Sequence, residues 1–584
     1  MKKFTILIFV CIWAQCAGAA VVSPDMAARY AGRFMGMSTL PVPEISKTQR
    51  AAGRDGEQNA AYYVYNNPDG GWVIIAADDR INPILGYSDN GSFSLDDMPE
   101  NLKWWMEGLA NTVEELRTSG VEASDAARTA WRALRSDTDV AESEQKVLES
   151  AKWYQEWPYN VMCPIVAGEN KRALTGCVAT AMAIIMRYNR WPERGKGLIG
   201  GYVTGSYRTY IHSFYLDSHV YDWDNMPLTD GEIAGWTDDQ ISEVSQLIYD
   251  CGVSVKMDYS EKDGSVVYEG YVPEVMIENF SYSDDIQYLY RSAYSLNEWF
   301  AVIKNEIDSE RLVLYSGSGD MGGHAFVCDG YDTHDSRLHI NWGWSGDADG
   351  FFTLDLKIDN YNYFPEEQTA IIGIVPDTCH VEMHDGRFVF NEGSNVSSGL
   401  VPIDSPDMKE GSPVQFKIGN IRNTSLQRIT KRFKVCLVDE SGNLRQEGWN
   451  CIINLPANNG YSYSFKTESA VLELTPELTD CFRLFVEDNN GNWVPMPANY
   501  DLFPDNDGVA CGVTPDPVII YDYNEKELRL TMGYVPVKSV RWSINDKDTD
   551  TPKVDLEPGR NSVKAYLEYM DGTEGTIRAT FMAK

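Results

Sequence analysis

The amino-acid sequence predicts a multidomain chain of the α+β class that ends in all-β modules. At about 150 residues per domain, its 584 residues suggest roughly four domains. Residues 146–376 carry helical patterns early and strand patterns late, which is typical of an α+β domain. From residue 377 onward, short alternating strands between Asn, Gly, Pro and Asp turns replace the helical periodicity. Hydrophobic residues make up 43% of the chain, which excludes a disordered protein.

The charge of the chain excludes two classes of partner. Asp and Glu total 86 against 50 Lys and Arg, so the formal net charge is −36. A nucleic-acid-binding protein needs a basic face to displace phosphate counterions, and adsorption to anionic lipid also needs positive charge. We therefore expect neither nucleic acid nor an anionic lipid surface as a partner.

Residues 1–19 have the pattern of a signal peptide. Two lysines near the start precede an apolar run at 4–14, and residues 17–19 (Ala-Gly-Ala) form a cleavage pattern. The run is too short to span a bilayer, and no later segment approaches the ~20 apolar residues of a membrane helix. We expect an exported chain without a transmembrane segment that is secreted, periplasmic or associated with the cell surface. Lipid attachment at Cys16 is an alternative that its neighbours disfavour.

Residues 20–120 are predicted to form a small α+β domain. Two apolar segments at 62–65 and 72–75 flank an Asn-Asn-Pro-Asp-Gly-Gly turn, which predicts a β-hairpin. A helix is expected over 99–116, where Leu, Trp and Met recur at helical spacing. The following stretch, 121–145, is rich in Ala, Ser and charge. It is interpreted as a linker or a loosely held helix, and as a site open to proteolysis.

The cysteine count points to an unpaired thiol. Of 11 cysteines, Cys11 and Cys16 lie in the predicted signal peptide, which leaves nine in the mature chain. An odd number means that at least one is free or pairs outside the chain, and such a thiol is a candidate nucleophile. No Cys/His spacing of the zinc type occurs, so we expect no metal site and no cofactor.

Cys177 is the strongest candidate nucleophile. It follows Gly176 at the start of a helix predicted over 176–188. The apolar residues of this segment recur at helical spacing and form one face. The unpaired N–H groups and the positive dipole end of a first turn stabilise a thiolate, which is the reactive form of cysteine. Another helix is expected to open at Thr237 or Asp238 and to stop at Gly252.

His324 is the candidate base. It follows two glycines ahead of a predicted strand at 325–329, between two further predicted strands at 312–315 and 338–342. The last of these strands carries Asn341 and Trp342. The amide of Asn341 can orient an imidazole, and the indole of Trp342 can cover that imidazole. A buried cysteine or a strand histidine is often only structural, so the residue types alone leave both readings open.

Four blocks in this order resemble the streptopain family, bacterial secreted cysteine peptidases with a papain-like catalytic domain. They lie at 154–160, 175–195, 322–330 and 341–352, and the resemblance covers about 145–376. Residues 20–120 also look like the inhibitory propeptide of that family. The resemblance implies a papain-like α+β domain preceded by a small α+β propeptide domain and followed by all-β sandwich-like modules.

The resemblance also implies a role for each site residue. Cys177 would attack the peptide carbonyl, and His324 would take its proton and later protonate the leaving amine. Asn341 would orient His324, and Trp342 would shield that contact. Gln155 would form the oxyanion hole together with the backbone N–H of Cys177.

The expected domains follow from these observations. They are the signal peptide 1–19, the inhibitory propeptide 20–120, the activation region 121–145, the catalytic domain 146–376, and β-sandwich-like modules at 377–513 and 514–584, with a break near 514–517.

The expected function is that of a secreted, zymogenic cysteine endopeptidase that acts through an acyl-enzyme and removes its own propeptide. Protein or peptide substrates, with Ile or Val next to the scissile residue, and the propeptide as an intramolecular inhibitor are the implied partners. The loop between Gln155 and Cys177 is shorter than in streptopain, which bears on substrate preference. Two alternatives remain: a catalytically silent surface protein that binds, for example, a host protein through its β modules, and an acyl transferase or peptidoglycan hydrolase.

Overall fold

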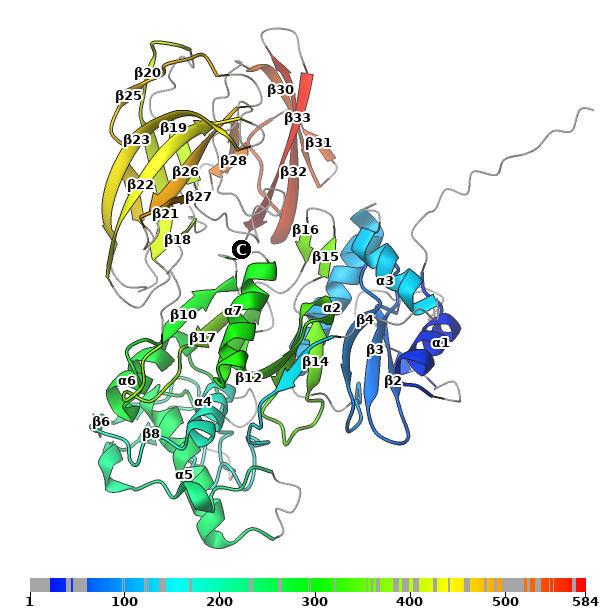
Figure 1. Cartoon of the computed structure of the whole chain (residues 1–584), viewed down its shortest axis with the longest axis vertical. Coiled ribbons are helices and arrows are strands. Elements are labelled where there is room, and N and C mark those ends of the chain that lie inside the picture. Colours follow the sequence, from blue (N-terminus) through cyan, green and yellow to red (C-terminus); the bar gives the residue numbers. More distant parts are fainter. Residues whose placement is uncertain are drawn as a thin grey trace, which may run out of the picture. The chain divides into compact units, whose positions relative to one another are not determined.

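The computed structural model describes most of the chain between residues 21 and 583 (Figure 1). The stretches outside the described residues are 1–20, 38–41, 43, 46–59, 97, 99, 120–122, 124, 136–142, 167–170, 230–234, 261–264, 292–293, 295, 320–321, 354–355, 359–360, 364–367, 382–387, 391–398, 403–408, 424–427, 440–441, 456–462, 477–479, 488–490, 496–518, 523–525, 531–536, 546, 550, 570–573 and 584. The expected signal peptide and the expected break near 514–517 therefore lie outside the described residues. None of the described helices has the length and apolar character that a membrane crossing requires.

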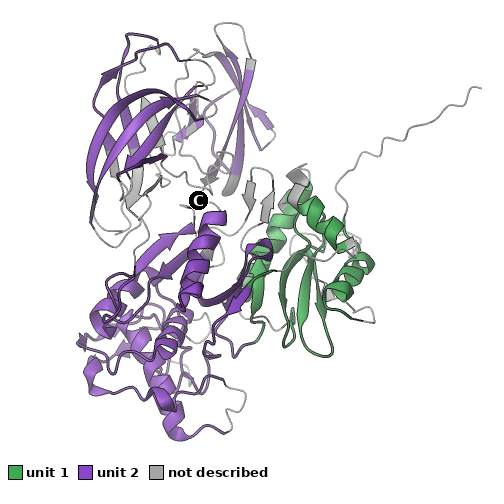
Figure 2. Cartoon of the chain, viewed as in Figure 1, with its two compact units in different colours: residues 1–144, 347–364 green, residues 145–346, 365–584 purple. Residues whose placement is uncertain are grey.

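The chain divides into two compact units (Figure 2). The first comprises residues 1–144 and 347–364, and the second comprises 145–346 and 365–584. The boundary after residue 144 lies next to the expected start of the catalytic domain at 146. The short segment 347–364, which was expected to belong to the catalytic domain, falls in the first unit.

The first unit contains an antiparallel sheet in the order β1-β2-β3-β4-β14. Its strands are β1 (Glu44–Ile45), β2 (Tyr62–Asn66), β3 (Trp72–Ala76), β4 (Ile84–Ser88) and β14 (Gly350–Thr353). The predicted hairpin is confirmed, since β2 pairs with β3 in antiparallel register. Its turn requires glycine at Gly71, where φ is +95° and an added Cβ would lie 2.8 Å from the carbonyl oxygen of Ser88.

Three helices accompany this sheet: α1 (Pro24–Phe34), α2 (Glu100–Ser119) and α3 (Asp125–Arg135). Helix α1 starts with Ser23 as N-cap, whose hydroxyl accepts from the N–H of Met26, and with a proline in its first turn. Helix α2 confirms the helix predicted over 99–116. The residues that define its spacing, Leu102, Trp105, Met106 and Leu109, are all buried.

Helix α3 occupies much of the stretch expected to be a linker or a loosely held helix. It is anchored rather than loose, because Trp131 is buried and its Nε1 donates to the carbonyl oxygen of Ile81 at 2.8 Å. The Trp131 ring also meets Tyr30 edge to face, with centroids 5.3 Å apart.

The segment 347–364 is joined to the N-terminal sheet by strand pairing and by aromatic packing. In β14, Phe351 lies opposite Tyr87 of β4, and their rings stack with centroids 5.0 Å apart. Gly350 permits the close approach, since an added Cβ would lie 2.6 Å from the carbonyl oxygen of Tyr87 and 2.7 Å from the Trp72 ring. The segment continues into a short hairpin of β15 (Leu356–Ile358) and β16 (Tyr361–Tyr363).

The N-terminal half of the second unit combines helices with an antiparallel sheet in the order β13-β12-β11-β17-β10, with β5 paired to β12. The strands are β5 (Gln145–Val147), β10 (Gln287–Tyr290), β11 (Val313–Gly319), β12 (Gly322–Asp332), β13 (Arg337–Asn341) and β17 (Thr369–Ile372). The helices are α4 (Cys177–Asn189), α5 (Asp238–Ser254), α6 (Val272–Phe280) and α7 (Leu296–Asp308). Two short strand pairs, β6 (Leu198–Ile199) with β9 (Phe214–Tyr215) and β7 (Tyr202–Val203) with β8 (Tyr210–Ile211), follow α4. The predicted helix-then-strand order is confirmed.

Helix α5 begins where the sequence predicts and ends later than predicted. Thr237 caps it, and the capping box with Gln240 is complete in both directions. The prediction that Gly252 stops the helix is wrong, because the helix continues to Ser254. Glycine is needed there for space: an added Cβ would lie 2.3 Å from the hydroxyl of Tyr259.

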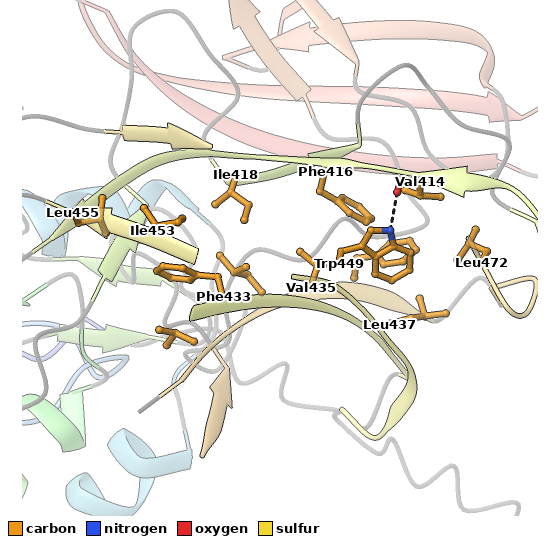
Figure 3. Close-up of a cluster of buried hydrophobic side chains, with 13 residues drawn as sticks. Val414, Phe416, Ile418, Phe433, Val435, Leu437, Trp449, Ile453, Leu455 and Leu472 are labelled. Carbon is orange, nitrogen blue, oxygen red and sulfur yellow. Dashed lines mark hydrogen bonds between the residues drawn. The ribbon is translucent and has the colours of Figure 1, made fainter. Parts of the chain in front are cut away.

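The first C-terminal module is built from two antiparallel sheets. One contains β18 (Phe388–Phe390), β19 (Gly399–Pro402), β21 (Phe416–Asn423) and β24 (Tyr463–Lys466), and the other contains β22 (Ile429–Val438), β23 (Leu444–Leu455), β26 (Cys481–Glu487) and β27 (Trp493–Pro495). A small pair, β20 (Pro413–Val414) with β25 (Ala470–Val471), adjoins them. Figure 3 shows the apolar cluster between β21 and β22, including Phe416 and Phe433. Trp449 lies in this cluster and donates from Nε1 to the carbonyl oxygen of Val414 at 2.7 Å.

The second module repeats the arrangement with fewer strands. Its sheet has the order β31-β30-β32-β33, formed by β30 (Val537–Ile544), β31 (Lys547–Thr549), β32 (Gly559–Tyr569) and β33 (Glu574–Ala583). A hairpin of β28 (Ile519–Asp522) and β29 (Glu527–Leu530) contributes apolar side chains to the same core, which is centred on Trp542 and Val563. The two cores, each formed by alternating strand residues, confirm the all-β, sandwich-like class of this region.

Candidate active site

Cys177 is the first residue of α4, and a dense set of contacts fixes the backbone just before it. Gly176 is the N-cap, and its carbonyl oxygen accepts from the hydroxyl of Thr180 at 3.0 Å. The carbonyl of Leu174 accepts from the Ser265 hydroxyl at 2.7 Å. The helix N-terminus therefore presents Cys177 at a defined position, and no side chain caps the first turn.

Gly176 cannot be replaced without moving this helix start. Its φ is +88°, and an added Cβ would lie 2.7 Å from Cε of Met257 and 2.9 Å from the carbonyl oxygen of Ser265. Met257 is flexible, but the carbonyl of Ser265 belongs to the backbone. The glycine therefore serves the placement of the nucleophile as well as leaving room beside it.

We expect Gly176→Ala to lower kcat/KM at least about tenfold, because steric displacement of a nucleophile by about 1 Å can cost about 10²-fold in rate. The measurement is peptide hydrolysis by the purified variant, with its thermal unfolding recorded in parallel. Gly200→Ala is the matched control, since nothing lies within 4 Å of an added Cβ at that position. An unchanged kcat/KM in Gly176→Ala would show that the glycine has no part in positioning Cys177.

Strand β12, which carries His324, contacts Cys177 through its backbone. The backbone N–H of Ala325, the next residue, donates to Sγ of Cys177 at 3.5 Å. His324 itself lies opposite Gly317 of β11 and is half-buried. The structure thus places the residue next to His324 against the sulfur of Cys177, although 147 positions of the chain separate the two predicted residues (324 − 177).

The surroundings of Cys177 favour its neutral form in this chain. Burial raises the pKa of the Cys177 thiol, and this is the largest influence on it. Backbone N–H groups of Ala325 and Val178 lower the pKa, but the net direction is upward.

The alternation of side chains along a strand shows which of Asn341, at the end of β13, and Trp342, which follows it, lies on the same face of the sheet as His324. Successive side chains of a strand point to opposite faces, so His324 and Phe326 share one face of β12. The Phe326 ring contacts Trp342, with centroids 4.8 Å apart, which places Trp342 on this face. Trp342 is buried and so stands where it can shield the histidine.

Asn341 was expected to bond His324, but its hydrogen-bond partners in the structure are other residues. It lies opposite Val327, three residues from His324, and so on the other face of β12. Its amide nitrogen donates to the hydroxyl of Ser150 at 2.8 Å and to the carbonyl oxygen of Ala151 at 3.0 Å, and its oxygen accepts from the N–H of Gly343 at 3.0 Å. None of these three hydrogen bonds involves His324. The expectation that Asn341 orients the imidazole therefore differs from the structure.

Gln155 lies beside the start of α4. Its carbonyl oxygen accepts from the N–H of Thr175 at 3.1 Å, two residues before the nucleophile. The residue is buried, and its side-chain amide has no hydrogen-bond partner among the described residues. A buried amide that is not engaged elsewhere is available to a substrate oxygen.

A buried network behind the site was missed by the sequence reading. Asp329 accepts from the hydroxyl of Ser150 at 2.5 Å and pairs with Nδ1 of His339 at 2.5 Å, while Nζ of Lys152 lies 3.7 Å away. Burial alone would raise the pKa of Asp329, but His339 and Lys152 bring it below its usual value. Through Ser150 this network meets Asn341, so it fixes the segment that leads to Gln155. Only the tertiary contacts reveal it.

The described residues offer no competing metal chemistry. No group of three or more His, Cys, Asp or Glu side chains among them is arranged to hold a metal ion. The described cysteines that are free thiols are Cys163, Cys177, Cys251, Cys328, Cys379, Cys436 and Cys451. Burial raises the pKa of Cys251 and Cys328 well above the usual value, which leaves them inert.

Comparison with known proteins finds matches for both the N-terminal part and the central part of the chain. Residues 153–352 match the peptidase C10 family, and residues 19–113 match the Spi protease inhibitor family. Streptopain from Streptococcus pyogenes is 33% identical over 335 residues, which cover 54% of this chain and 80% of streptopain. The thiol protease/hemagglutinin PrtT from Porphyromonas gingivalis is 33% identical over 363 residues, which cover 59% of this chain and 38% of PrtT.

Among solved structures, a cysteine-to-alanine mutant fragment of prointerpain A from Prevotella intermedia is similar. It is 26% identical, with a TM-score of 0.44, over 57% of this chain and 99% of that fragment. The fold and the sequence matches define a cysteine-type peptidase with a papain-like domain and an N-terminal inhibitor domain. The chain belongs to the streptopain family, also called the peptidase C10 family.

Proposed function

We propose that the chain is an exported, zymogenic cysteine endopeptidase that hydrolyses protein substrates and removes its own N-terminal unit. The observation that carries the proposal is the contact between Cys177 Sγ and the N–H of Ala325, which joins the nucleophile helix to the strand of His324. Neither residue alone implies catalysis, but a cysteine at an open helix N-terminus beside a strand histidine is the arrangement that thiol acyl transfer needs.

In the proposed mechanism, His324 accepts the proton of Cys177, and the thiolate attacks the carbonyl carbon of the scissile peptide. The N–H of Cys177 and the side-chain amide of Gln155 donate to the oxyanion that forms. His324 then protonates the leaving amine, which leaves an acyl-enzyme. Water, deprotonated by the same imidazole, attacks the thioester and restores the thiol. Trp342 keeps bulk water from the histidine.

Asn341 has a positioning role in this proposal. Its hydrogen bonds to Ser150 and Ala151, together with those of Asp329, hold the chain that runs to Gln155. It acts through the placement of the oxyanion-hole residue rather than through the imidazole. Release of the N-terminal unit within 121–145 is the proposed activating step.

Latency is supported by the way the N-terminal sheet holds the segment 347–364. That segment follows Trp342 and Trp344 closely in sequence, yet its β14 pairs with β4 of the inhibitor-like domain. The β modules are proposed to provide surface or host-protein contacts, and export through the signal peptide completes the proposal.

We expect an epoxide inhibitor of papain-like enzymes to label Cys177 at one equivalent per processed chain and to abolish casein cleavage. Mass spectrometry of the labelled protein and a casein assay before and after labelling provide the measurement. Cys379→Ser is the control, because Cys379 is an exposed free thiol outside the site and should not be required for labelling.

The same experiment separates the alternatives. Labelling of Cys177 without casein cleavage would favour acyl transfer to an amine or peptidoglycan hydrolysis. Failure of the inhibitor to label Cys177 would favour a catalytically silent protein that binds through its β modules.

A further inference from the structure

A carboxylate outside the expected catalytic set lies close to the nucleophile. Glu269 begins the short 3₁₀ helix η4 (Glu269–Tyr271) and is half-buried. One of its oxygens, Oε1, accepts from the hydroxyl of Tyr288 at 2.9 Å and from the hydroxyl of Ser316 at 3.3 Å. Two donors on one oxygen fix the orientation of the carboxylate.

Sheet register places this carboxylate beside Cys177. Ser316 lies directly opposite Ala325, whose N–H bonds the cysteine sulfur, and facing residues in antiparallel strands have Cα atoms about 4.5–5.5 Å apart. Ser316 also lies opposite Thr369 of β17, and their hydroxyls are 2.5 Å apart. The side chains of Ala325, Ser316 and Thr369 therefore share one face, and Glu269 is bound to that face.

The negative charge of Glu269 also acts on the pKa of Cys177. It is one of the influences that raise the pKa of the Cys177 thiol. A negative charge near a thiol disfavours the thiolate, which explains this direction.

Glu269 differs from two other inward-facing acids of the described chain, Glu306 and Asp329, in its lack of a counter-ion. Glu306 pairs with Arg311 at 2.6 Å, and Asp329 pairs with His339 and Lys152. No Lys, Arg or His among the described residues forms an ion pair with Glu269, and its Oε2 accepts no hydrogen bond from them. A fixed carboxylate with one unused oxygen is arranged to receive a cation from outside the chain.

Two exposed aromatic rings flank this acid. Tyr268 and Tyr271 are each 52% exposed, and their rings meet edge to face with centroids 5.6 Å apart. Exposed tyrosine faces attract Lys and Arg side chains and cover their apolar stems.

We propose that Glu269 is a specificity-determining residue that selects substrates with a Lys or Arg side chain close to the scissile bond. This inference rests on the proposed peptidase function and replaces the expected preference for Ile or Val. The substrate cation would bind Oε2 through charge-assisted hydrogen bonds while Tyr288 and Ser316 hold Oε1. The net negative charge of the chain, −36, adds long-range attraction for cationic peptides.

The test uses matched fluorogenic peptides that carry arginine or its neutral isostere citrulline, in turn, at each of the three positions before the scissile bond. With the processed full-length protein, we expect kcat/KM for arginine to exceed that for citrulline about tenfold or more at one position. Glu269→Gln should bring this ratio close to one. Glu274→Gln is the matched control, because Glu274 is an exposed acid of α6, and it should keep the wild-type ratio.

Two further measurements keep the test decisive if Glu269→Gln folds poorly. Glu269→Asp, which keeps the charge on a shorter side chain, should give an intermediate ratio. The wild-type ratio should fall as salt is raised from 0.05 to about 0.5 M, because a half-exposed ion pair is screened.

Equal cleavage of the arginine and citrulline peptides by wild type, with normal epoxide labelling of Cys177, would overturn this inference and leave the proposed function standing. A full arginine preference in folded Glu269→Gln would overturn it as well. If wild type is neither labelled nor able to cleave any peptide, the proposed function itself fails, and the inference fails with it.

Discussion

Cys177→Ala should abolish cleavage of casein and should leave the chain at full length under conditions in which wild type sheds its N-terminal unit. The methyl group of alanine can neither lose a proton to His324 nor form an acyl bond, so no slower version of the covalent route remains. Because α4 already begins with buried small residues, this substitution should not disturb the fold. Gel electrophoresis and mass spectrometry of the two proteins, incubated side by side, provide the measurement.

Two controls give this comparison its meaning. Cys379→Ser should mature like wild type, since Cys379 is exposed and remote in sequence from the site. A trace of active wild type added to Cys177→Ala should shorten it, which shows that the junction is intact and that only the nucleophile is missing. If Cys177→Ala alone shortens as fast as wild type, self-processing is wrong and another peptidase performs the cut.

Gln155→Ala should reduce kcat by about 10²–10³, the usual cost of removing one oxyanion-hole donor. The side chain is buried beside the N-terminus of α4 and has no hydrogen-bond partner among the described residues, so alanine removes a donor without breaking a structural contact. The N–H of Cys177 would remain as the other donor. Steady-state kinetics with a peptide substrate should show the loss in kcat and little change in KM, as expected for a contact made mainly in the transition state.

Glu156→Ala is the matched control for this variant, because Glu156 is the exposed neighbour of Gln155 in the same segment. It should retain wild-type kcat and KM. A loss in Gln155→Ala that falls wholly in KM would instead assign the amide to ground-state substrate binding, and an unchanged kcat would remove it from the oxyanion hole.

Local patterns could be predicted well because their causes are local. The hairpin at 62–76, the start of α4 at Cys177 and the capping box of α5 each depend on residues a few positions apart. The end of α5 could not be predicted, since Gly252 has its reason in Tyr259, which packs against it from outside the helix. The neighbouring residues in sequence suggested that Gly252 ends the helix, whereas its role is to leave space for Tyr259.

The site divides in the same way. Cys177, His324 and Gln155 could be chosen from residue type, motif and resemblance. The role of Asn341 could not, because strand register and alternation decide which face it occupies. Tertiary contacts also bring Asp329 to Ser150 and Glu269 to Ser316, and neither acid belongs to a motif.

By itself, the sequence determined the class of this protein: an α+β domain with a cysteine at a helix start, an inhibitor-like domain before it and β modules after it. Only the tertiary structure decided that β14 of the segment 347–364 pairs with β4, that Asn341 bonds Ser150 and Ala151, and that Tyr288 and Ser316 hold the Glu269 carboxylate. The physical reason is that helix starts and turns are governed by neighbours in sequence. Strand partners and buried charges depend instead on which distant surfaces fit together.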